Sequence, residues 1–278
     1  METGCALSRA RQYKIEEESE GKRMGLKLKG KTAVVTGGSR GIGRAIGLRL
    51  AREGASIGIL ALHEDKAQKT GAEIKALGVE VIALGCDVTD YAQVKAGVEK
   101  VHRALGSIDI LVNNAGIDKV QPFVETDHSS WDRIIDVNYR GFLIACHVCI
   151  PYMIEQKSGN IVSLGSDAGR IGNPGEVLYC GTKAAIMASS KALARELARY
   201  NIRVNCVSPG PVRTDLWNNL HEGEKGEKVT EAVTRAIPLR RLGTPEEVAD
   251  VVAFFVSEDA RYLTGQVLSV DGGLTMIG

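Results

Sequence analysis

The chain has 278 residues, which allows two small domains, although a single α/β domain also reaches this length. Hydrophobic residues make up 44%, charged residues 25%, and 32 residues are glycine, which indicates a soluble globular protein with many tight turns. The formal net charge of +1 gives no reason to expect binding to nucleic acid or to an acidic membrane surface. We find no run of about 18–20 apolar residues and no apolar leader, so we expect a cytoplasmic protein without a membrane span.

Residues 1–28 differ from the rest of the chain. They are polar and contain the acidic run Glu16–Glu18, which argues against a transit peptide. We therefore predict a flexible N-terminal extension over 1–28, followed by one domain over 29–278.

From Lys31 onward, short β-branched or apolar runs alternate with longer helical patterns. This alternation predicts an α/β fold, a single Rossmann-type doubly wound parallel sheet of about seven strands with helices on both faces. The expected strands lie at 32–36, 55–62, 79–86, 108–114, 160–166, 202–208 and 266–270. The expected helices lie at 43–53, 64–77, 91–105, 131–155, 180–200 and 245–257.

The segment Thr36–Gly43, TGGSRGIG, joins the first strand to the first helix. Gly37, Gly41 and Gly43 would let the backbone turn tightly and approach a pyrophosphate, which the amides at a helix N-terminus attract. The spacing differs from the common G-x-G-x-x-G. The position between strand and helix nevertheless predicts a dinucleotide site.

The end of the second strand bears on the choice of cofactor. It reads Leu60 to His63 and has no carboxylate, which would repel a 2′-phosphate, while Arg40 in the glycine loop could attract one. This favours NADP(H). Glu64 and Asp65 follow directly, so a strand that ended two residues later would restore NAD(H) as the alternative.

Six cysteines are scattered along the chain, mostly within apolar runs. The CHVC stretch, Cys146 to Cys149, lies inside a helical pattern, with no second cysteine pair and no clustered histidines near it. We interpret these cysteines as reduced thiols that pack in the core, and we predict no metal site.

Tyr179 and Lys183 lie four residues apart, at the start of a helical pattern. At this spacing the two side chains project from one face of a helix, where an ammonium stabilises a phenolate and lowers the pKa of the tyrosine. Such a pair can transfer a proton. Alone it is weak evidence, because the same spacing is common on solvated helices.

The segment from Val212 to Ile237 is densely charged and interrupts the alternation of strands and helices. Loops that carry specificity often have this composition, and a solvated pair of surface helices would look the same. We predict a lid over about 212–237, with the helix pair as the alternative.

Taken together, TGGSRGIG, NNAG at Asn113–Gly116 and YCGTK at Tyr179–Lys183 resemble the short-chain dehydrogenase/reductase family, from about Leu28 to Gly278. The resemblance implies that Asp87 contacts an adenine, that NNAG supports the cofactor channel, and that the segment Ser208–Thr214 contacts a nicotinamide carboxamide. The implied cofactor-binding residues are Gly37, Ser39, Arg40, Gly41, Ile42, Gly43, Asp87, Val88, Asn114, Ala115, Gly116, Tyr179, Lys183, Pro209, Gly210, Val212 and Thr214.

The family resemblance also implies a catalytic set of Asn138, Ser166, Tyr179 and Lys183. Ser166 stands at the family's distance of thirteen residues before the tyrosine, with Ser163 as the competitor. The expected roles follow from charge that develops on a carbonyl oxygen during hydride transfer. Tyr179 would donate the proton, Ser166 would bond the oxygen, and Lys183 would lower the tyrosine pKa and hold the ribose. Asn138 would hold a water that links Lys183 to solvent.

Within the family, the loops resemble 3-oxoacyl-[acyl-carrier-protein] reductases and hydroxyacyl-CoA dehydrogenases of the 2-hydroxycyclohexanecarboxyl-CoA type. We therefore expect a ketone and a secondary alcohol on an acyl-CoA or acyl carrier protein thioester as the substrate pair. The alternatives are a secondary alcohol or sugar dehydrogenase and, with less support, an inactive nucleotide-binding regulatory protein. The resemblance further implies a homotetramer built through the helices at 131–155 and 179–200 and the C-terminal strand.

Overall fold

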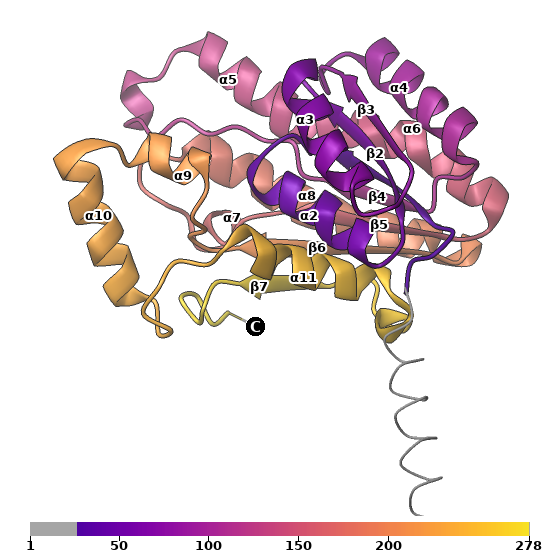
Figure 1. Ribbon diagram of the computed structural model, residues 1–278. Helices are drawn as coiled ribbons and strands as arrows, with labels where there is room; N and C mark the ends of the chain where they lie inside the picture. The colour runs from indigo at the N-terminus through magenta and orange to yellow at the C-terminus, as the bar shows by residue number, and fades with distance from the viewer. Residues whose placement is uncertain (1–26, 278) are drawn as a thin grey trace, which may run out of the picture.

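The computed structural model describes residues 27–277, and in this range seven parallel strands form one sheet (Figure 1). The sheet order is β3-β2-β1-β4-β5-β6-β7. The strands are β1 (Thr32–Thr36), β2 (Ser56–Ala61), β3 (Val81–Gly85), β4 (Ile110–Asn113), β5 (Gly159–Leu164), β6 (Ile202–Pro209) and β7 (Val267–Val270). The predicted doubly wound fold is confirmed.

Helices cover both faces of the sheet. The α-helices are α2 (Gly41–Arg52), α3 (Glu64–Lys75), α4 (Tyr91–Leu105), α5 (His128–Ile135), α6 (Gly141–Gln156), α7 (Ala168–Ile171), α8 (Val177–Leu197), α9 (Asp215–Leu220), α10 (Gly223–Ala236) and α11 (Pro245–Val256). Three short 3-10 turns lie at Phe123–Glu125, Ala198–Tyr200 and Glu258–Ala260.

Two apolar clusters fill the space between the helices and the sheet. One contains Leu50 of α2, Ile74 of α3 and Phe255 of α11, and the other contains residues of α4, α6 and α8. Each helix therefore buries its apolar side against one face of the sheet, whose strands are buried on both faces.

The order of the strands reverses beside β1. The chain passes from β1 to β2 and β3 on one side, and then returns to β4 on the other side of β1. In open parallel sheets such a reversal opens a crevice at the carboxyl ends of the strands, because the connections leave in opposite directions. This crevice is where the glycine loop and the NNAG segment meet.

The helix expected over 131–155 consists of three parts. A π-helical turn, Asp136–Arg140, separates α5 from α6, and Asn138 lies at its centre. By length and composition, the whole stretch His128–Gln156 could cross a membrane, which the sequence analysis missed. Half of its most apolar window is buried inside the fold, where Cys149 and Met153 belong to the core.

The folded domain begins before the predicted boundary. Leu28 is buried in the core, and its N–H donates to the carbonyl of Glu53 at 2.8 Å. Residue 28 therefore belongs to the domain and not to an extension. The rest of the predicted extension, 1–26, lies outside the described residues.

Candidate active site

A cleft of about 470 Å³ opens at the carboxyl ends of the central strands. The glycine loop, the ends of β2, β4, β5 and β6, the start of α8 and part of α9 line it. Every residue of the predicted cofactor set lines this cleft. These residues are Gly37, Ser39, Arg40, Gly41, Ile42, Gly43, Asp87, Val88, Asn114, Ala115, Gly116, Tyr179, Lys183, Pro209, Gly210, Val212 and Thr214.

The glycine loop packs too tightly for side chains. Gly37 has a φ of +65°, and a Cβ there would lie 2.8 Å from Cα of Ala115. A Cβ on Gly43 would lie 2.4 Å from the carbonyl oxygen of Gly37. No side chain caps the amino end of α2, so its first amides remain available for an anionic group such as a pyrophosphate.

Asn114 fixes the relation between the glycine loop and the NNAG segment. Its Nδ2 donates to the carbonyls of Thr36 and Gly37 at 3.0 and 3.1 Å, and its N–H donates to Oγ1 of Thr36. These bonds join the ends of the neighbouring strands β1 and β4. The amide side chain thus supports the floor of the cleft, as the sequence predicts for this segment.

The end of β2 places polar and cationic groups in the cleft but no carboxylate. The strand ends at Ala61, and Leu62, His63 and Arg40 all line the cleft. Glu64 lies instead beside the end of β3, since a Cβ on Gly85 would lie 3.1 Å from Cβ of Glu64. The later strand end that would have restored the NAD(H) alternative is therefore absent.

Asp87 occupies the far end of the cleft. Its Oδ1 accepts bonds from the N–H and the hydroxyl of Thr89 at 2.9 and 2.8 Å, which fixes the carboxylate. Nη1 of Arg133, on α5, lies 3.8 Å from its Oδ2 and also faces the cleft. Arg133 was not predicted from the sequence. A helical pattern does not show that this side of the helix turns toward the end of a distant strand.

Ser166, Tyr179 and Lys183 line the same cleft, whereas Ser163 does not. Ser163 is fully buried in the sheet and accepts a bond from Nδ2 of Asn113 at 3.3 Å. The structure thus favours Ser166 over its competitor. Lys183 is 4% exposed, its Nζ lies 5.5 Å from the ring centre of Tyr179, and it donates to the carbonyl of Leu164 at 2.8 Å.

The pKa shifts of Tyr179 and Lys183 differ from those that the sequence predicts. Burial lowers the pKa of Lys183 to about 8, with Cys206 and Asp118 acting in the opposite direction. Burial raises the pKa of Tyr179, the nearby Ser166 hydroxyl lowers it, and the charges of Asp118 and Glu176 raise it further. Within the protein, the surroundings of Tyr179 therefore favour the protonated phenol, and the expected lowering by Lys183 does not prevail.

Asn138 lies beneath the cleft and not on its wall. It is 1% exposed; its Oδ1 accepts from the N–H of Ile117 at 2.8 Å, and its Nδ2 donates to the carbonyl of Ile117 at 2.9 Å. Nδ2 also donates to the hydroxyl of Thr182 at 3.2 Å. The amide of Asn138 thus positions the chain that follows NNAG, a contact that the sequence did not reveal.

Two acidic residues at the catalytic end of the cleft were missed. Asp118 follows Ile117, Glu176 precedes α8, and both line the cleft with Tyr179. Burial, followed by the negative charge of Glu176, raises the pKa of Asp118 to about 6. Glu176 stands three residues before Tyr179, so its closeness to the tyrosine could have been recognised in the sequence. The position of Asp118 near Glu176 depends on the path of the loop after NNAG.

The segment 212–237 forms two helices. Thr214 caps α9 by accepting from the N–H of Trp217 at 3.1 Å, and Leu216, Trp217 and Leu220 present apolar side chains to the cleft. Figure 1 shows α10 projecting at the edge of the molecule, next to α9. The helix-pair alternative therefore describes the local structure, and closure as a lid stays a prediction.

The cysteines contribute to packing. Cys146 and Cys149 are buried in the core, and burial raises the pKa of both thiols, that of Cys146 to about 12. Across residues 27–277, no group of three or more His, Cys, Asp or Glu side chains could hold a metal ion.

The chain is similar to known proteins along most of its length. A family model described as enoyl-(acyl carrier protein) reductase matches residues 37–275. The 3-oxoacyl-[acyl-carrier-protein] reductase FabG of Staphylococcus aureus is 41% identical over 247 residues, which cover 88% of this chain and 98% of that protein. The FabG of Thermotoga maritima is 40% identical over 251 residues, with 90% and 100% coverage.

Solved structures extend the comparison. A short-chain dehydrogenase/reductase from Mycobacterium marinum superposes with a TM-score of 0.85 at 35% identity and covers 91% of this chain and 98% of its own. An NAD+-bound xylitol dehydrogenase has the same TM-score at 34% identity, with 89% and 100% coverage. On this evidence the chain belongs to the short-chain dehydrogenase/reductase family, and it is an oxidoreductase that interconverts a ketone and a secondary alcohol.

Proposed function

We propose that the protein reduces the ketone of a 3-oxoacyl thioester with NADPH, using Ser166, Tyr179 and Lys183 as catalytic residues. The observation that carries the proposal is that these three side chains line the same cleft as the glycine loop. The relatives from Staphylococcus aureus and Thermotoga maritima, whose names state a 3-oxoacyl-[acyl-carrier-protein] reductase, support the substrate class.

The chemistry assigns one task to each residue. A nicotinamide cofactor, held by the residues of the cleft, would supply the hydride, and negative charge would develop on the carbonyl oxygen of the substrate. Tyr179, whose surroundings keep the phenol protonated, donates a proton to this oxygen, while Ser166 donates a hydrogen bond to it. Lys183 provides positive charge beside the phenol as the phenolate forms. Asn138 acts indirectly, by holding Ile117.

The preference for NADP(H) is supported by the end of β2. Arg40 of the glycine loop and His63, which follows β2, both line the cleft, and the end of the strand from Leu60 to His63 contributes no carboxylate to its wall. A 2′-phosphate gains charge-assisted hydrogen bonds from a guanidinium, whereas a carboxylate at this place would select the ribose hydroxyls of NAD(H). NAD(H) remains the alternative cofactor, as bound in the xylitol dehydrogenase structure.

The proposal also includes a homotetramer and a lid formed by the segment 212–237. Large apolar side chains are exposed on α5, α6, α8 and β7, including Ile135, Leu143, Val177 and Leu268, and a homotetramer would cover them. In the proposed lid, α9 would move over the substrate, because its apolar side chains already face the cleft. We place the enzyme in the cytoplasm, beside a soluble thioester substrate.

A second candidate is a secondary alcohol or polyol dehydrogenase. It is favoured by the similarity to xylitol dehydrogenase over nearly the whole chain. Both activities need the same proton donor, so the site residues do not separate them. An inactive regulatory protein is the least supported alternative, since Ser166, Tyr179 and Lys183 all line the cleft.

One experiment tests the proposal. The purified protein is assayed with NADPH and NADH against acetoacetyl-CoA, an acetoacetyl carrier protein, a simple ketone and, in the oxidative direction, xylitol. We expect the highest kcat/KM for a thioester with NADPH, and a loss of about 10²–10⁴-fold in kcat for Tyr179→Phe with cofactor binding retained. Turnover that is unchanged in Tyr179→Phe would remove the assignment of the proton donor.

A further inference from the structure

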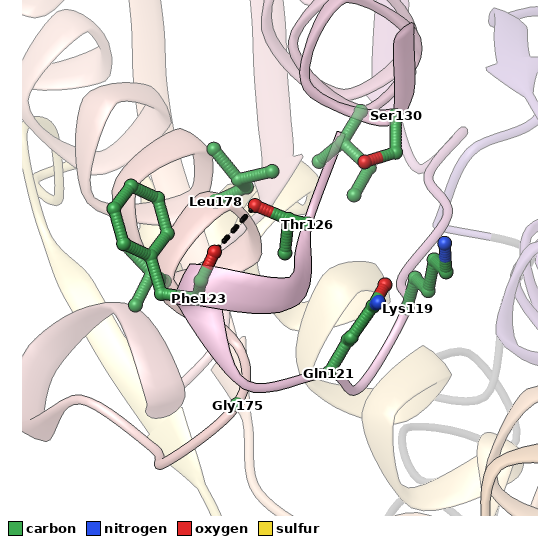
Figure 2. Close-up of a pocket in the computed structure, with 9 residues that line it drawn as sticks. Lys119, Gln121, Phe123, Thr126, Ser130, Gly175 and Leu178 are labelled. Carbon is green, nitrogen blue, oxygen red and sulfur yellow. Dashed lines mark hydrogen bonds between the residues drawn. The ribbon is translucent and has the colours of Figure 1, made fainter. Parts of the chain in front are cut away.

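Asp118 and Glu176 come from segments that are distant in the sequence but joined in the fold. The N–H of Gln121 donates to the carbonyl of Gly175 at 2.9 Å, which links the loop after NNAG to the residues before α8. Figure 2 shows Gln121 and Gly175 on these adjoining segments, beside a small cavity of about 10 Å³. That cavity has room for about one water and for no substrate.

The loop that carries Asp118 is fixed at several points. Asn138 bonds both main-chain polar groups of Ile117, one residue before Asp118. Farther along, Nε2 of Gln121 donates to the carbonyl of Glu125 at 2.6 Å, and the hydroxyl of Thr126 donates to the carbonyl of Phe123 at 2.7 Å (Figure 2). Asp118 is therefore held on the wall of the cleft by its neighbours in the chain.

The hydrogen bonds that Asp118 and Glu176 accept come from neutral groups. Oδ1 of Asp118 accepts from the N–H of Lys119 at 2.7 Å, and Oε2 of Glu176 accepts from Nδ2 of Asn173 at 3.1 Å. Within residues 27–277, no salt bridge involves either group. The buried cation nearest in the site, Lys183, donates to the carbonyl of Leu164 instead.

The two acids therefore give the catalytic end of the cleft a negative potential. A third carboxylate brought beside them by a substrate, in a site partly shielded from water, meets repulsion that bulk solvent does not remove. A neutral ester or thioester meets none. From α9, Asp215, Leu216, Trp217 and Leu220 line the same cleft, and none of these side chains supplies a compensating positive charge.

We propose that Asp118 and Glu176 are specificity-determining residues that exclude substrates with a carboxylate next to the reacting ketone and admit the neutral thioester. The inference rests on the proposed function, because it concerns the group attached to the ketone that Tyr179 protonates. It separates a 3-oxoacyl thioester from the free 3-oxo acid that its hydrolysis would produce.

The test begins with the wild-type protein and a series of substrates that differ in charge. Acetoacetate, methyl acetoacetate and the N-acetylcysteamine thioester of acetoacetate share the same ketone and differ in the group beside it. We expect kcat/KM for the neutral ester and thioester to exceed that for acetoacetate by about tenfold or more at pH 7.5. A choline ester of the same acid, which carries a positive charge, should be used at least as well as the methyl ester.

Variants then assign the effect to the two residues. Asp118→Asn, Glu176→Gln and the double variant should lower the ratio of kcat/KM for ester over acid toward one, with the largest change in the double variant. Glu196→Gln is the matched control, because Glu196 is exposed on α8 and does not line the cleft. It should leave the ratio at its wild-type value.

Different outcomes contradict the role of Asp118 and Glu176 and the proposed thioester function. Equal use of acid and ester by the wild-type protein would overturn the role of the acids while leaving the proposed function intact. A preference for the ester that persists in a folded double variant would overturn it as well. If no ketone in the series is reduced but a polyol is oxidised, the proposed thioester function fails first.

Discussion

The side-chain amide of Asn138 forms two hydrogen bonds with the main chain of Ile117: its Oδ1 accepts from the N–H at 2.8 Å, and its Nδ2 donates to the carbonyl at 2.9 Å. The π-helical turn Asp136–Arg140 places this side chain beneath the NNAG segment. The pairing fixes a stretch of backbone that has no strand or helix to satisfy its polar groups. It therefore connects a helix distortion to the position of Asp118 in the cleft.

Replacement of Asn138 tests this connection. Asn138→Ala leaves the N–H and the carbonyl of Ile117 without partners, so we expect the free energy of unfolding to fall by about 2 kcal/mol in urea titrations. The preference for a neutral thioester over the free acid should fall too, because Asp118 loses its support. Thr182→Val removes the third bond of Asn138 and the bond from the Thr182 hydroxyl to the carbonyl of Tyr179, but it leaves both partners of Ile117 in place and should cost less. Equal losses in the two variants would show that Ile117 is not the important partner.

Much of the site was accessible from the sequence, because its signals are local. Gly43 was predictable from its place between a strand and a helix, and Tyr179 and Lys183 from their spacing together with the TGGSRGIG and NNAG motifs. The π-helical turn was not predictable, since the pattern over 131–155 is also compatible with a continuous helix. The approach of Asp118 to Glu176 depends on a loop bond between Gln121 and Gly175, which no periodicity records.

The glycine loop provides a second prediction. Gly43→Ala would place a Cβ 2.4 Å from the carbonyl oxygen of Gly37, which forces the loop and α2 apart. We expect a loss of more than about 2 kcal/mol in unfolding free energy and weaker binding of NADPH, measured by calorimetry. Gly181→Ala, in the second turn of α8 with no other atom within 4 Å of the added Cβ, is the control. It should be neutral or stabilising by up to about 1 kcal/mol.

Asp118 should reduce the stability of the protein at neutral pH. Its pKa is raised to about 6 in the folded protein, against about 3.9 in an unfolded chain, so the folded state binds the proton more tightly. Stability is then lost as the pH rises from about 4 to 6. With allowance for partial exposure to solvent, Asp118→Asn should gain about 1–2 kcal/mol at pH 7 and nothing at pH 3.5. Thermal unfolding at the two pH values measures this difference, and an equal gain at both would contradict it.

Lys183 should set the alkaline limit of ketone reduction. Burial lowers its pKa to about 8, and above that value the ammonium that stabilises the forming phenolate of Tyr179 is lost. We expect kcat/KM for reduction to fall as the pH rises through about 8. The negative charge of Asp118 raises the pKa of Lys183, so Asp118→Asn should shift this fall to lower pH. A profile that stays in place in this variant would show that the two groups are not coupled.

Arg40 should distinguish the two nicotinamide cofactors. Its side chain lines the cleft at the end of β2, where Ala61 leaves no carboxylate to hold ribose hydroxyls. Arg40→Ala removes a charge-assisted bond to a 2′-phosphate, so kcat/KM for NADPH should fall by about tenfold or more while that for NADH changes little. Ala61→Asp adds the missing carboxylate and should shift the preference further toward NADH. Equal losses with both cofactors in Arg40→Ala would place Arg40 on the shared pyrophosphate, and the selection of NADPH would then rest on other residues.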